Sequence, residues 1–279
     1  MDRLDGGLLT VPFSEPKGDT MVQAFEDHFS EHAQDYARYR PCYSADLFEY
    51  LAAIAPACRL AWDCGTGNGQ AAVELAKHFE RVVGTDASGE QIASAFQHER
   101  IEYRVERAEE TSLEPDSVDL VTVAIAVHWF DFEAFYRQVQ LTLKPRGVVA
   151  VWTYSLPVVD EGVDRALARY YGQILAGYWP ERIRYIEERY RTLPFPFPEL
   201  TPPAFQMESE WDLEQFLGFL YSWSATRKYL KERGTNPLKI IWPELAAAWG
   251  DAAQKRAVYW PLHMRAGRKD GSGAGRQLS

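Results

Sequence analysis

Cysteine is scarce in this 279-residue sequence, and its spacing excludes two common uses. The cysteines are Cys42, Cys58 and Cys64, and no two of them form a C-x-x-C pair. An odd number of such thiols indicates neither a disulfide framework nor a thiolate zinc site. The segment from His28 to His32 matches an H-x-x-E-H zinc pattern, but no convincing third ligand accompanies it. We therefore predict no metal site.

Positive charge and long apolar runs are also lacking. Thirty Lys and Arg residues against forty Asp and Glu residues give a formal net charge of -10, which disfavours binding to a phosphate backbone. The best apolar run, Leu120 to Val127, is too short to cross a bilayer, and residues 1–5 contain no apolar signal core. We expect a cytoplasmic monomer or homodimer with neither nucleic acid nor membrane as a partner.

Aromatic residues, by contrast, are abundant: they make up 14% of the chain and fall heavily in its second half. Most of them belong in the core, and the remainder suit a pocket for a planar or apolar ligand.

The first half of the chain has the pattern of a parallel sheet. Residues 1–24 contain Gly and Pro without periodicity and are expected to form a flexible arm, followed by an amphipathic helix from Phe25 to Tyr39. Ser44 can cap a second helix. Short apolar strands then alternate with helices of about ten residues. The expected strands are Arg59–Cys64, Val82–Thr85, Ile101–Val105, Leu120–Ala126 and Val148–Thr153, and the expected helices are Gln70–Phe79, Glu90–Gln97 and Phe132–Leu143, the last capped by Asp131.

The second half changes character. We predict a helical lid over residues 156–203, completion of the sheet and of a substrate pocket over residues 204–265 with a strand from Arg256 to Met264, and a disordered tail over residues 266–279. Residues 25–155 form the core. The predicted fold is α/β: a doubly wound, Rossmann-like sheet of about seven strands, mostly parallel with an antiparallel last strand, plus the helical lid.

The glycine loop Asp63-Cys64-Gly65-Thr66-Gly67-Asn68-Gly69 joins the first strand of this pattern to the next helix. Glycines at such a turn let the backbone approach a nucleotide-like ligand closely. A dinucleotide fingerprint, G-x-G-x-x-G, would need glycine where this chain has Gln70. S-Adenosylmethionine carries no pyrophosphate but has an ammonium group, which Asp63 at the strand tip can engage directly or through water. The loop therefore favours S-adenosylmethionine over a nicotinamide dinucleotide.

Asp86 is the second landmark. It closes the next strand, twenty-three positions after Asp63 (86 minus 63), where a carboxylate can accept hydrogen bonds from both ribose hydroxyls. The plain alternative is that the loop is only a tight turn and that both aspartates cap helices. Two carboxylates at successive strand ends favour the cofactor site.

In these motifs the sequence resembles the class I S-adenosylmethionine-dependent methyltransferases, specifically the methyltransferase type 11 and trans-aconitate methyltransferase-like small-molecule group. The resemblance covers roughly residues 25–155. Besides the glycine loop and Asp86, it rests on Ala108-Glu109, Val118-Asp119-Leu120-Val121, His128-Trp129-Phe130-Asp131 and Leu143-Lys144-Pro145-Arg146-Gly147.

The resemblance implies a set of cofactor contacts. Gly65 and Gly67 would hold the methionine moiety, Asp86 the ribose, and Ala108-Glu109 would lie beside the adenine. Many relatives have Asp where this chain has Arg107, so the adenine contact is expected from the Ala108 backbone. The expected cofactor-binding residues are Tyr36, Arg40, Asp63, Gly65, Thr66, Gly67, Asp86, Ala87, Ala108, Glu109, Ala124 and Trp129.

His128 is the candidate catalytic residue, because it follows the fourth strand at the edge where open parallel sheets bind ligands. It can act as a general base, orient an acceptor or hold the loop beneath the cofactor. Trp129 is expected to pack. Trp223 and Arg227 are candidate substrate-binding residues; Arg227 could hold a carboxylate with its planar fork, and the ordinary alternative is a surface ion pair.

The predicted function is methyl transfer from S-adenosylmethionine to an oxygen of a small aromatic or carboxylic metabolite, with S-adenosylhomocysteine as the product. The alternatives are a non-catalytic S-adenosylmethionine-binding protein and a nicotinamide-dependent oxidoreductase.

Overall fold

The computed structural model describes residues 41–271 of the chain. The chain divides into two units, Met1–Arg38 and Tyr39–Ser279, and all the described residues belong to the second. The predicted arm, the helix from Phe25 to Tyr39, the H-x-x-E-H segment, Tyr36 and Arg40 lie outside the described residues.

The centre of the described chain is an eight-stranded sheet in the order β3-β2-β1-β4-β5-β8-β6, with β7 paired to β8. The first five strands in this order are mutually parallel, and β8 is antiparallel to its three neighbours. The mostly parallel, doubly wound sheet with an antiparallel last strand is therefore confirmed. The strands are β1 Leu60–Cys64, β2 Arg81–Asp86, β3 Ile101–Val105, β4 Val118–Ala124, β5 Leu143–Tyr154, β6 Glu199–Leu200, β7 Phe205–Trp211 and β8 Arg256–Arg268.

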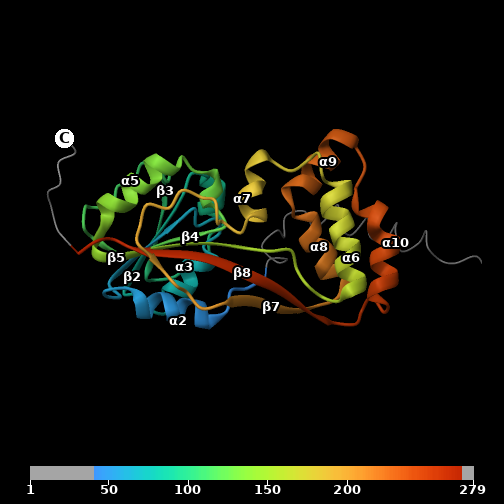
Figure 1. The fold of residues 1–279 in the computed structure, drawn as a ribbon, viewed down its shortest axis with the longest axis horizontal. Coiled ribbons are helices and arrows are strands. Elements are labelled where there is room, and N and C mark those ends of the chain that lie inside the picture. Colours follow the sequence, from blue (N-terminus) through green and yellow to red (C-terminus); the bar gives the residue numbers. More distant parts are fainter. Residues whose placement is uncertain (1–40, 272–279) are drawn as a thin grey trace, which may run out of the picture. The chain divides into compact units, whose positions relative to one another are not determined.

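Helices cover both faces of this sheet (Figure 1). Alternate residues of β4 enter two separate cores, with Val121 and Val123 in one and Leu120 in the other. The first core contains Phe135 from α5, and the second contains Leu47 from α2. The helices of this half are α2 Ala45–Ile54, α3 Gln70–Leu75, α4 Gly89–Ala93, the short 3₁₀ helix η2 Val127–Trp129 and α5 Phe132–Thr142. Burial on both faces explains why five of the seven residues of β4 are apolar.

The helices after β5 form a separate layer beyond one end of the sheet, in which α6 packs on α10 (Figure 1). They are α6 Glu161–Arg169, the π-helical turn η3 Tyr170–Ile174, the 3₁₀ turn η4 Glu181–Ile183, α7 Arg184–Glu187, α8 Leu213–Tyr221, α9 Ser224–Arg233 and α10 Leu238–Trp249. None of the helices within residues 41–271 combines the length and apolar character needed to cross a membrane.

The second half differs from the sequence prediction in its strands. Two strands, β6 and β7, were not predicted, although β7 buries alternate residues in the period that marks a strand. The last strand was predicted to end at Met264 but continues to Arg268, into the stretch assigned to the tail. Gly267 permits this continuation, because a Cβ atom there would lie 2.7 Å from Phe195 and Phe197.

Asp119 holds the amino ends of β1, β4 and β5 together. Its buried carboxylate accepts hydrogen bonds from the backbone N–H groups of Arg59 and Leu60, both at 3.0 Å, and from Lys144 Nζ at 2.7 Å. Paired in this way, the charge is satisfied inside the sheet.

Asp119→Ala is expected to lower the free energy of unfolding by about 3 kcal/mol, because it removes one partner of a buried ion pair and leaves two backbone donors unsatisfied. Urea denaturation checks this value. Glu133→Ala, which breaks the exposed Glu133–Arg137 pair, is the control and should leave the unfolding midpoint nearly unchanged. Equal midpoints for the two variants would contradict this role of Asp119.

Candidate functional site

Several predicted site residues come together at the carboxyl ends of β1, β2 and β4, whereas Trp223 and Arg227 do not lie there. β1 pairs with β2 on one side and β4 on the other, so Asp63, Asp86 and the segment after Ala124 meet at one edge of the sheet. This is the edge at which open parallel sheets bind ligands.

The glycine loop depends on three left-handed residues. Gly65, Gly67 and Gly69 have φ values of 69°, 57° and 85°. The backbone N–H groups of Gly65 and Thr66 donate to the carbonyl of Thr85, at 2.8 and 2.9 Å, which fastens the loop to β2. Glycine adopts such angles without steric cost, so the loop conformation follows from the sequence.

Gly65 also lies against the segment that follows β4. A Cβ atom on Gly65 would lie 2.6 Å from the Ala126 Cβ and 3.1 Å from the Phe130 ring. At Gly67, by contrast, the nearest atom to such a Cβ would be Gln91 Oε1 at 3.8 Å. The loop is therefore supported at Gly65 and has free space at Gly67, as a backbone cradle requires.

Asp63 lies beneath this loop and is fully buried. Its carboxylate accepts hydrogen bonds from Thr66 Oγ1 at 2.6 Å and Thr122 Oγ1 at 2.8 Å. Burial raises the pKa of Asp63 to about 6, against the effect of these two hydroxyls. The Asp63 carboxylate is thus hydrogen-bonded to hydroxyl groups of the protein itself.

Asp86 closes the other side of the loop. Its two carboxylate oxygens accept hydrogen bonds from the Gly67 and Ser88 backbone N–H groups, both at 2.9 Å. Asp86 is only partly buried, and the adjoining Ala87 is exposed. This carboxylate can hold the loop and still accept hydrogen bonds from a ligand, since each oxygen has more than one lone pair.

The predicted adenine side is linked to α5. Ala108 is buried, whereas Arg107 is exposed and pairs with Glu109 at 3.3 Å. The other oxygen of Glu109 accepts a hydrogen bond from the backbone N–H of Asp131 at 2.9 Å. Arg107 therefore points to solvent, in keeping with a contact from the Ala108 backbone.

His128 is buried, and its ring contacts a residue of the predicted lid. Nδ1 lies 2.8 Å from Tyr190 Oη. Burial, with the nearby Arg182, lowers the pKa of His128 to about 4, so the ring is neutral at pH 7. The neighbouring Trp129 is 55% exposed, so its indole is available to a ligand.

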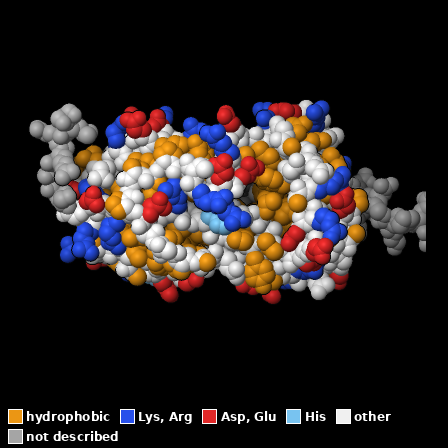
Figure 2. Space-filling view, in the orientation of Figure 1, with side chains coloured by type: hydrophobic (Ala, Val, Ile, Leu, Met, Phe, Trp, Pro, Cys, Tyr) orange, Lys and Arg blue, Asp and Glu red, His pale blue; other side chains and the backbone are white. Residues whose placement is uncertain are grey.

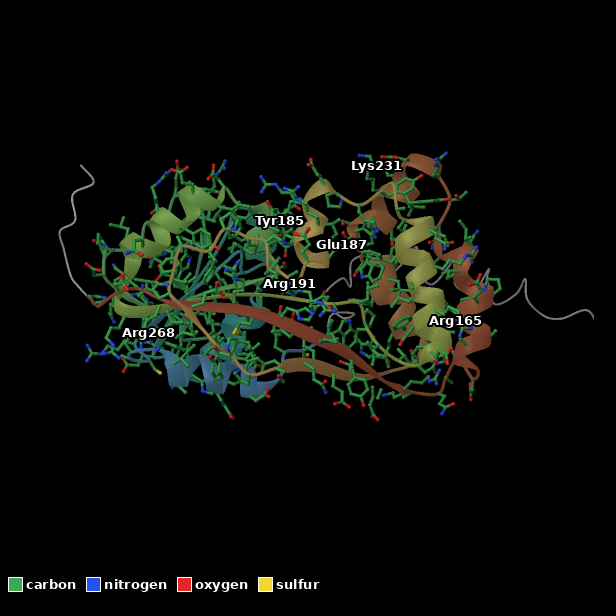
Figure 3. The ribbon with its side chains drawn as sticks, viewed as in Figure 1. Arg165, Tyr185, Glu187, Arg191, Lys231 and Arg268 are labelled. Atoms are coloured by element: carbon green, nitrogen blue, oxygen red, sulfur yellow. The ribbon has the colours of Figure 1, made fainter. Side chains whose placement is uncertain are left out.

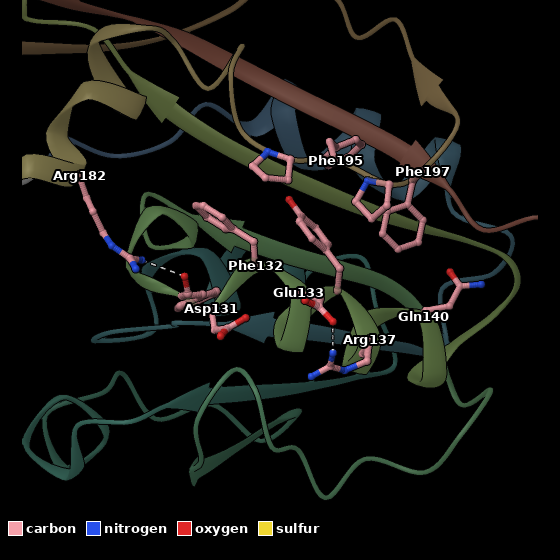
Figure 4. Close-up of a pocket in the computed structure, with 12 residues that line it drawn as sticks. Asp131, Phe132, Glu133, Arg137, Gln140, Arg182, Phe195 and Phe197 are labelled. Atoms are coloured by element: carbon pink, nitrogen blue, oxygen red, sulfur yellow. Dashed lines mark hydrogen bonds and ion pairs between the residues drawn. The ribbon is translucent and has the colours of Figure 1, made fainter. Parts of the chain in front are cut away.

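Arg182 and Tyr190 are site-edge residues that the sequence analysis missed. Arg182 Nη1 donates to the carbonyls of His128 and Phe130, at 3.0 and 2.9 Å, and Figure 4 shows its side chain reaching toward the start of α5. No sequence signal marks either residue, since both belong to a lid without a recognisable motif.

An open groove of about 810 Å³ lies between α5 and residues 194–197, which include Pro194 and Pro196 (Figure 4). Phe132 and Phe195 contribute to its apolar wall, and Phe130 and Arg182 also line it. Because Phe130 contacts Gly65 as well, this groove and the glycine loop share one side chain.

Trp223 and Arg227 lie in the helical layer. Trp223 packs among Tyr170, Tyr171, Trp179 and Phe219. Arg227 is exposed and stacks its guanidinium 4.9 Å from the Tyr221 ring centroid. The ring contacts of Trp223 and the cation–π contact of Arg227 are therefore with this layer and not with the glycine loop.

The short helix α7 connects the core with that layer. Figure 3 shows Tyr185 and Glu187 on α7, with Lys231 on α9. Tyr185 packs edge-on against Phe132 of α5, and Glu187 accepts a hydrogen bond from Tyr171 Oη at 2.9 Å. On the face drawn in Figure 2, hydrophobic side chains gather between α7 and the helices α8 and α9.

These residues fit S-adenosylmethionine on structural grounds. A strand-end carboxylate accepts a hydrogen bond from the Gly67 N–H, and a Cβ atom on Gly67 would meet no atom closer than 3.8 Å. Where a dinucleotide site would have its third glycine, this chain has Gln70, whose side-chain amide donates to the Pro41 carbonyl at 3.2 Å.

Comparisons with known proteins agree with this geometry. A family model described as a methyltransferase domain matches residues 62–151. A protein of Dictyostelium discoideum named as a methyltransferase is 31% identical over 88% of this chain and 96% of its own length. A probable S-adenosylmethionine-dependent methyltransferase of Saccharomyces cerevisiae is 26% identical over 72% of this chain and 82% of its own.

Among solved structures, a protein of Anaeromyxobacter dehalogenans named as a type II methyltransferase superposes with a TM-score of 0.78. The two sequences are 45% identical, and the match covers 82% of this chain and 97% of the other chain.

His128→Asn provides a test of the buried histidine, because asparagine can keep the contact to Tyr190 but does not titrate. Since the folded pKa of about 4 lies below the ordinary 6.5, the stabilisation from neutral His128 is complete above pH 6.5 and is lost as the pH falls toward 4. Relative to the variant, the wild type should lose up to about 3 kcal/mol of unfolding free energy across this interval. Denaturant melts at several pH values measure the difference.

The comparison with a variant is necessary because Asp63 titrates in the opposite sense. Its folded pKa of about 6 lies above the ordinary 3.8, so its protonation favours the fold as the pH falls through the same interval. Asp63 is present in both proteins, so its contribution to the pH dependence of unfolding cancels in the difference between them. A wild-type minus His128→Asn difference that stays constant from pH 7 to 4 would contradict the buried neutral state.

Proposed function

The chain belongs to the class I S-adenosylmethionine-dependent methyltransferases, and from this we propose that it transfers the methyl group to an oxygen of a small aromatic or carboxylic metabolite. The observation that carries the proposal is the Gly67–Asp86 contact, which places a carboxylate and a glycine cradle together at the carboxyl edge of the sheet.

The cofactor roles are assigned from position. Gly65, Thr66 and Gly67 would hold the methionine end through their backbone, and Asp86 with Ala87 would hold the ribose. Ala108 and Glu109 would lie beside the adenine, and Ala124 and Trp129 would complete the site from the β4 side. Tyr36 and Arg40 are proposed at the methionine end from the resemblance alone.

Asp63 is proposed to act on the cofactor through the loop. Its buried carboxylate accepts hydrogen bonds from Thr66 and Thr122, so its charge orients the loop and favours a cation above it. An ammonium group bound there would in turn stabilise the ionised form of Asp63 and lower its pKa.

S-Adenosylmethionine supplies a methyl group that is already activated on a sulfonium, so the protein has to align the acceptor and exclude water. His128 is a weak candidate for a base, because a pKa of about 4 leaves little driving force for taking a proton at neutral pH. We assign it the positioning role instead. An acceptor oxygen that is anionic at neutral pH, such as a carboxylate, then needs no base.

The acceptor pocket is proposed between the carboxyl edge of the sheet and the helical layer. The lid over residues 156–203 and the pocket over residues 204–265 are proposed boundaries. Support comes from the hydrophobic side chains near α7 on the face drawn in Figure 2. Trp223, which packs near Trp179, adds to it. Arg227 stacks on Tyr221, so its contact with a substrate carboxylate requires the side chain to turn.

Asp86→Asn and Asp86→Ala separate the two proposed roles of this carboxylate, which are to hold the glycine loop and to bind the ribose. Asparagine can still accept from the Gly67 N–H but carries no charge for the ribose, so we expect tenfold weaker binding of S-adenosylhomocysteine, and a larger loss for alanine. Calorimetry measures both affinities. Asp116→Ala, at the opposite end of the strands, is the control, and an Asp86→Ala protein that binds like the wild type would overturn the ribose assignment.

A methyl-transfer screen tests the activity itself. Radiolabelled S-adenosylmethionine is offered with aromatic and aliphatic carboxylates, phenols and amines, and carboxylates are expected to accept the label. Tight cofactor binding without transfer to any member of the panel would favour the non-catalytic alternative. Membership of the methyltransferase family already decides against the nicotinamide-dependent oxidoreductase.

A further inference from the structure

The segment 126–131 touches both sides of the proposed cofactor site. Ala126 and Phe130 support Gly65 on the methionine side. The backbone N–H of Asp131 donates to Glu109 on the adenine side, at 2.9 Å. A displacement of this one segment would therefore disturb the two ends of the cofactor site together.

The segment begins with an unfavourable backbone conformation. Ile125 has a φ of 57°, in the left-handed region that a β-branched residue rarely adopts. Such a conformation persists only where surrounding contacts hold it. The backbone N–H of Ile125 donates to the Trp152 carbonyl at 2.9 Å, which anchors the start of the segment but not its remainder.

Residues 181–190 of the proposed lid supply the missing support. Arg182 Nη1 donates to the carbonyls of His128 and Phe130, and Tyr190 Oη lies 2.8 Å from His128 Nδ1. Three hydrogen bonds from one stretch thus meet within three consecutive residues of the segment. The carbonyls at the end of the short helix η2 have no helical partner of their own, so Arg182 satisfies them.

The charged guanidinium of Arg182 donates the hydrogen bonds to the carbonyls of His128 and Phe130. Within residues 41–271 no ion pair is recorded for Arg182, and its guanidinium lies 5.9 Å from the Phe132 ring centroid. A charged donor forms a stronger hydrogen bond to a carbonyl than a neutral one. Tyr190 is fully buried, so its hydroxyl has to be satisfied by protein groups such as His128.

We propose that Arg182 and Tyr190 are positioning residues for methyl transfer: they hold residues 126–131 in the conformation that supports the glycine loop, and so set the affinity for S-adenosylmethionine without contacting it. The inference rests on the cofactor site proposed above. Because Glu187 of the same stretch bonds to Tyr171, the support also connects the cofactor site to the helical layer.

The test measures binding of S-adenosylhomocysteine by calorimetry to full-length Arg182→Ala, Arg182→Lys and Tyr190→Phe. Arg182→Ala should weaken binding about tenfold and Tyr190→Phe several-fold, since each loses support for the segment. Arg182→Lys should fall in between, because an ammonium keeps the charge but not the planar fork. The double variant Arg182→Ala/Tyr190→Phe should lose less than the product of the single factors, as both act on His128.

Arg184→Ala is the matched control. Arg184 lies on the same stretch, but its guanidinium contacts the Tyr185 ring and hydroxyl instead of the segment 126–131. Its affinity should stay within twofold of the wild type. Urea melts of all variants identify any general loss of stability.

Hydrogen exchange distinguishes positioning from a general structural role. In Arg182→Ala, the amides of Trp129, Phe130 and Asp131 should exchange faster while those of β1 and β4 keep their wild-type rates. Uniformly faster exchange, or wild-type affinity in both Arg182→Ala and Tyr190→Phe, would overturn the proposal. If the wild-type protein itself failed to bind S-adenosylhomocysteine, the proposed cofactor site would be wrong and not merely the role of Arg182.

Discussion

The cofactor edge depends on how closely two backbone segments approach at Gly65. No side chain fits there, because Ala126 lies where a Cβ atom would have to go. The loop after β1 can therefore rest directly on the segment after β4, and that segment in turn rests on Arg182 and Tyr190 from the lid. The glycine loop thus lies on the segment after β4, and that segment lies against Arg182 and Tyr190.

Charge is arranged in the same layered manner. Asp63 is buried under the loop, where two threonine hydroxyls donate to it and, within the described residues 41–271, no basic side chain pairs with it. Asp86 lies at the rim and uses backbone donors. Both carboxylates lie at the carboxyl edge of the sheet, and Asp86, like Asp63, has no ion pair with a basic side chain within residues 41–271.

The sequence predicted the first half of the fold well and the second half poorly, for identifiable reasons. Strand Ile101–Val105 has the predicted bounds, and Asp131 caps α5 through the Ala134 N–H, because local alternation and capping chemistry determine these features. The contacts of Arg182 and Tyr190 with His128 join residues more than fifty positions apart, and no local pattern encodes them. β7 was missed although Phe205, Met207 and Trp211 carry its burial pattern, since only one strand, Arg256–Met264, was predicted over residues 204–265. The left-handed conformation of the glycine loop could be predicted because glycine itself is the signal for it.

The long strand β8 has a consequence for how the molecule is assembled. It pairs with β5 across a wide gap in sequence: Val148 lies opposite Arg268, 120 positions later (268 minus 148). Until β8 arrives, β5 would present an unpaired apolar edge that includes Val149, Val151 and Trp152. An open edge of this composition recruits strands from other molecules. The interval between forming the parallel strands and adding β8 is therefore the time at which the chain is most liable to aggregate.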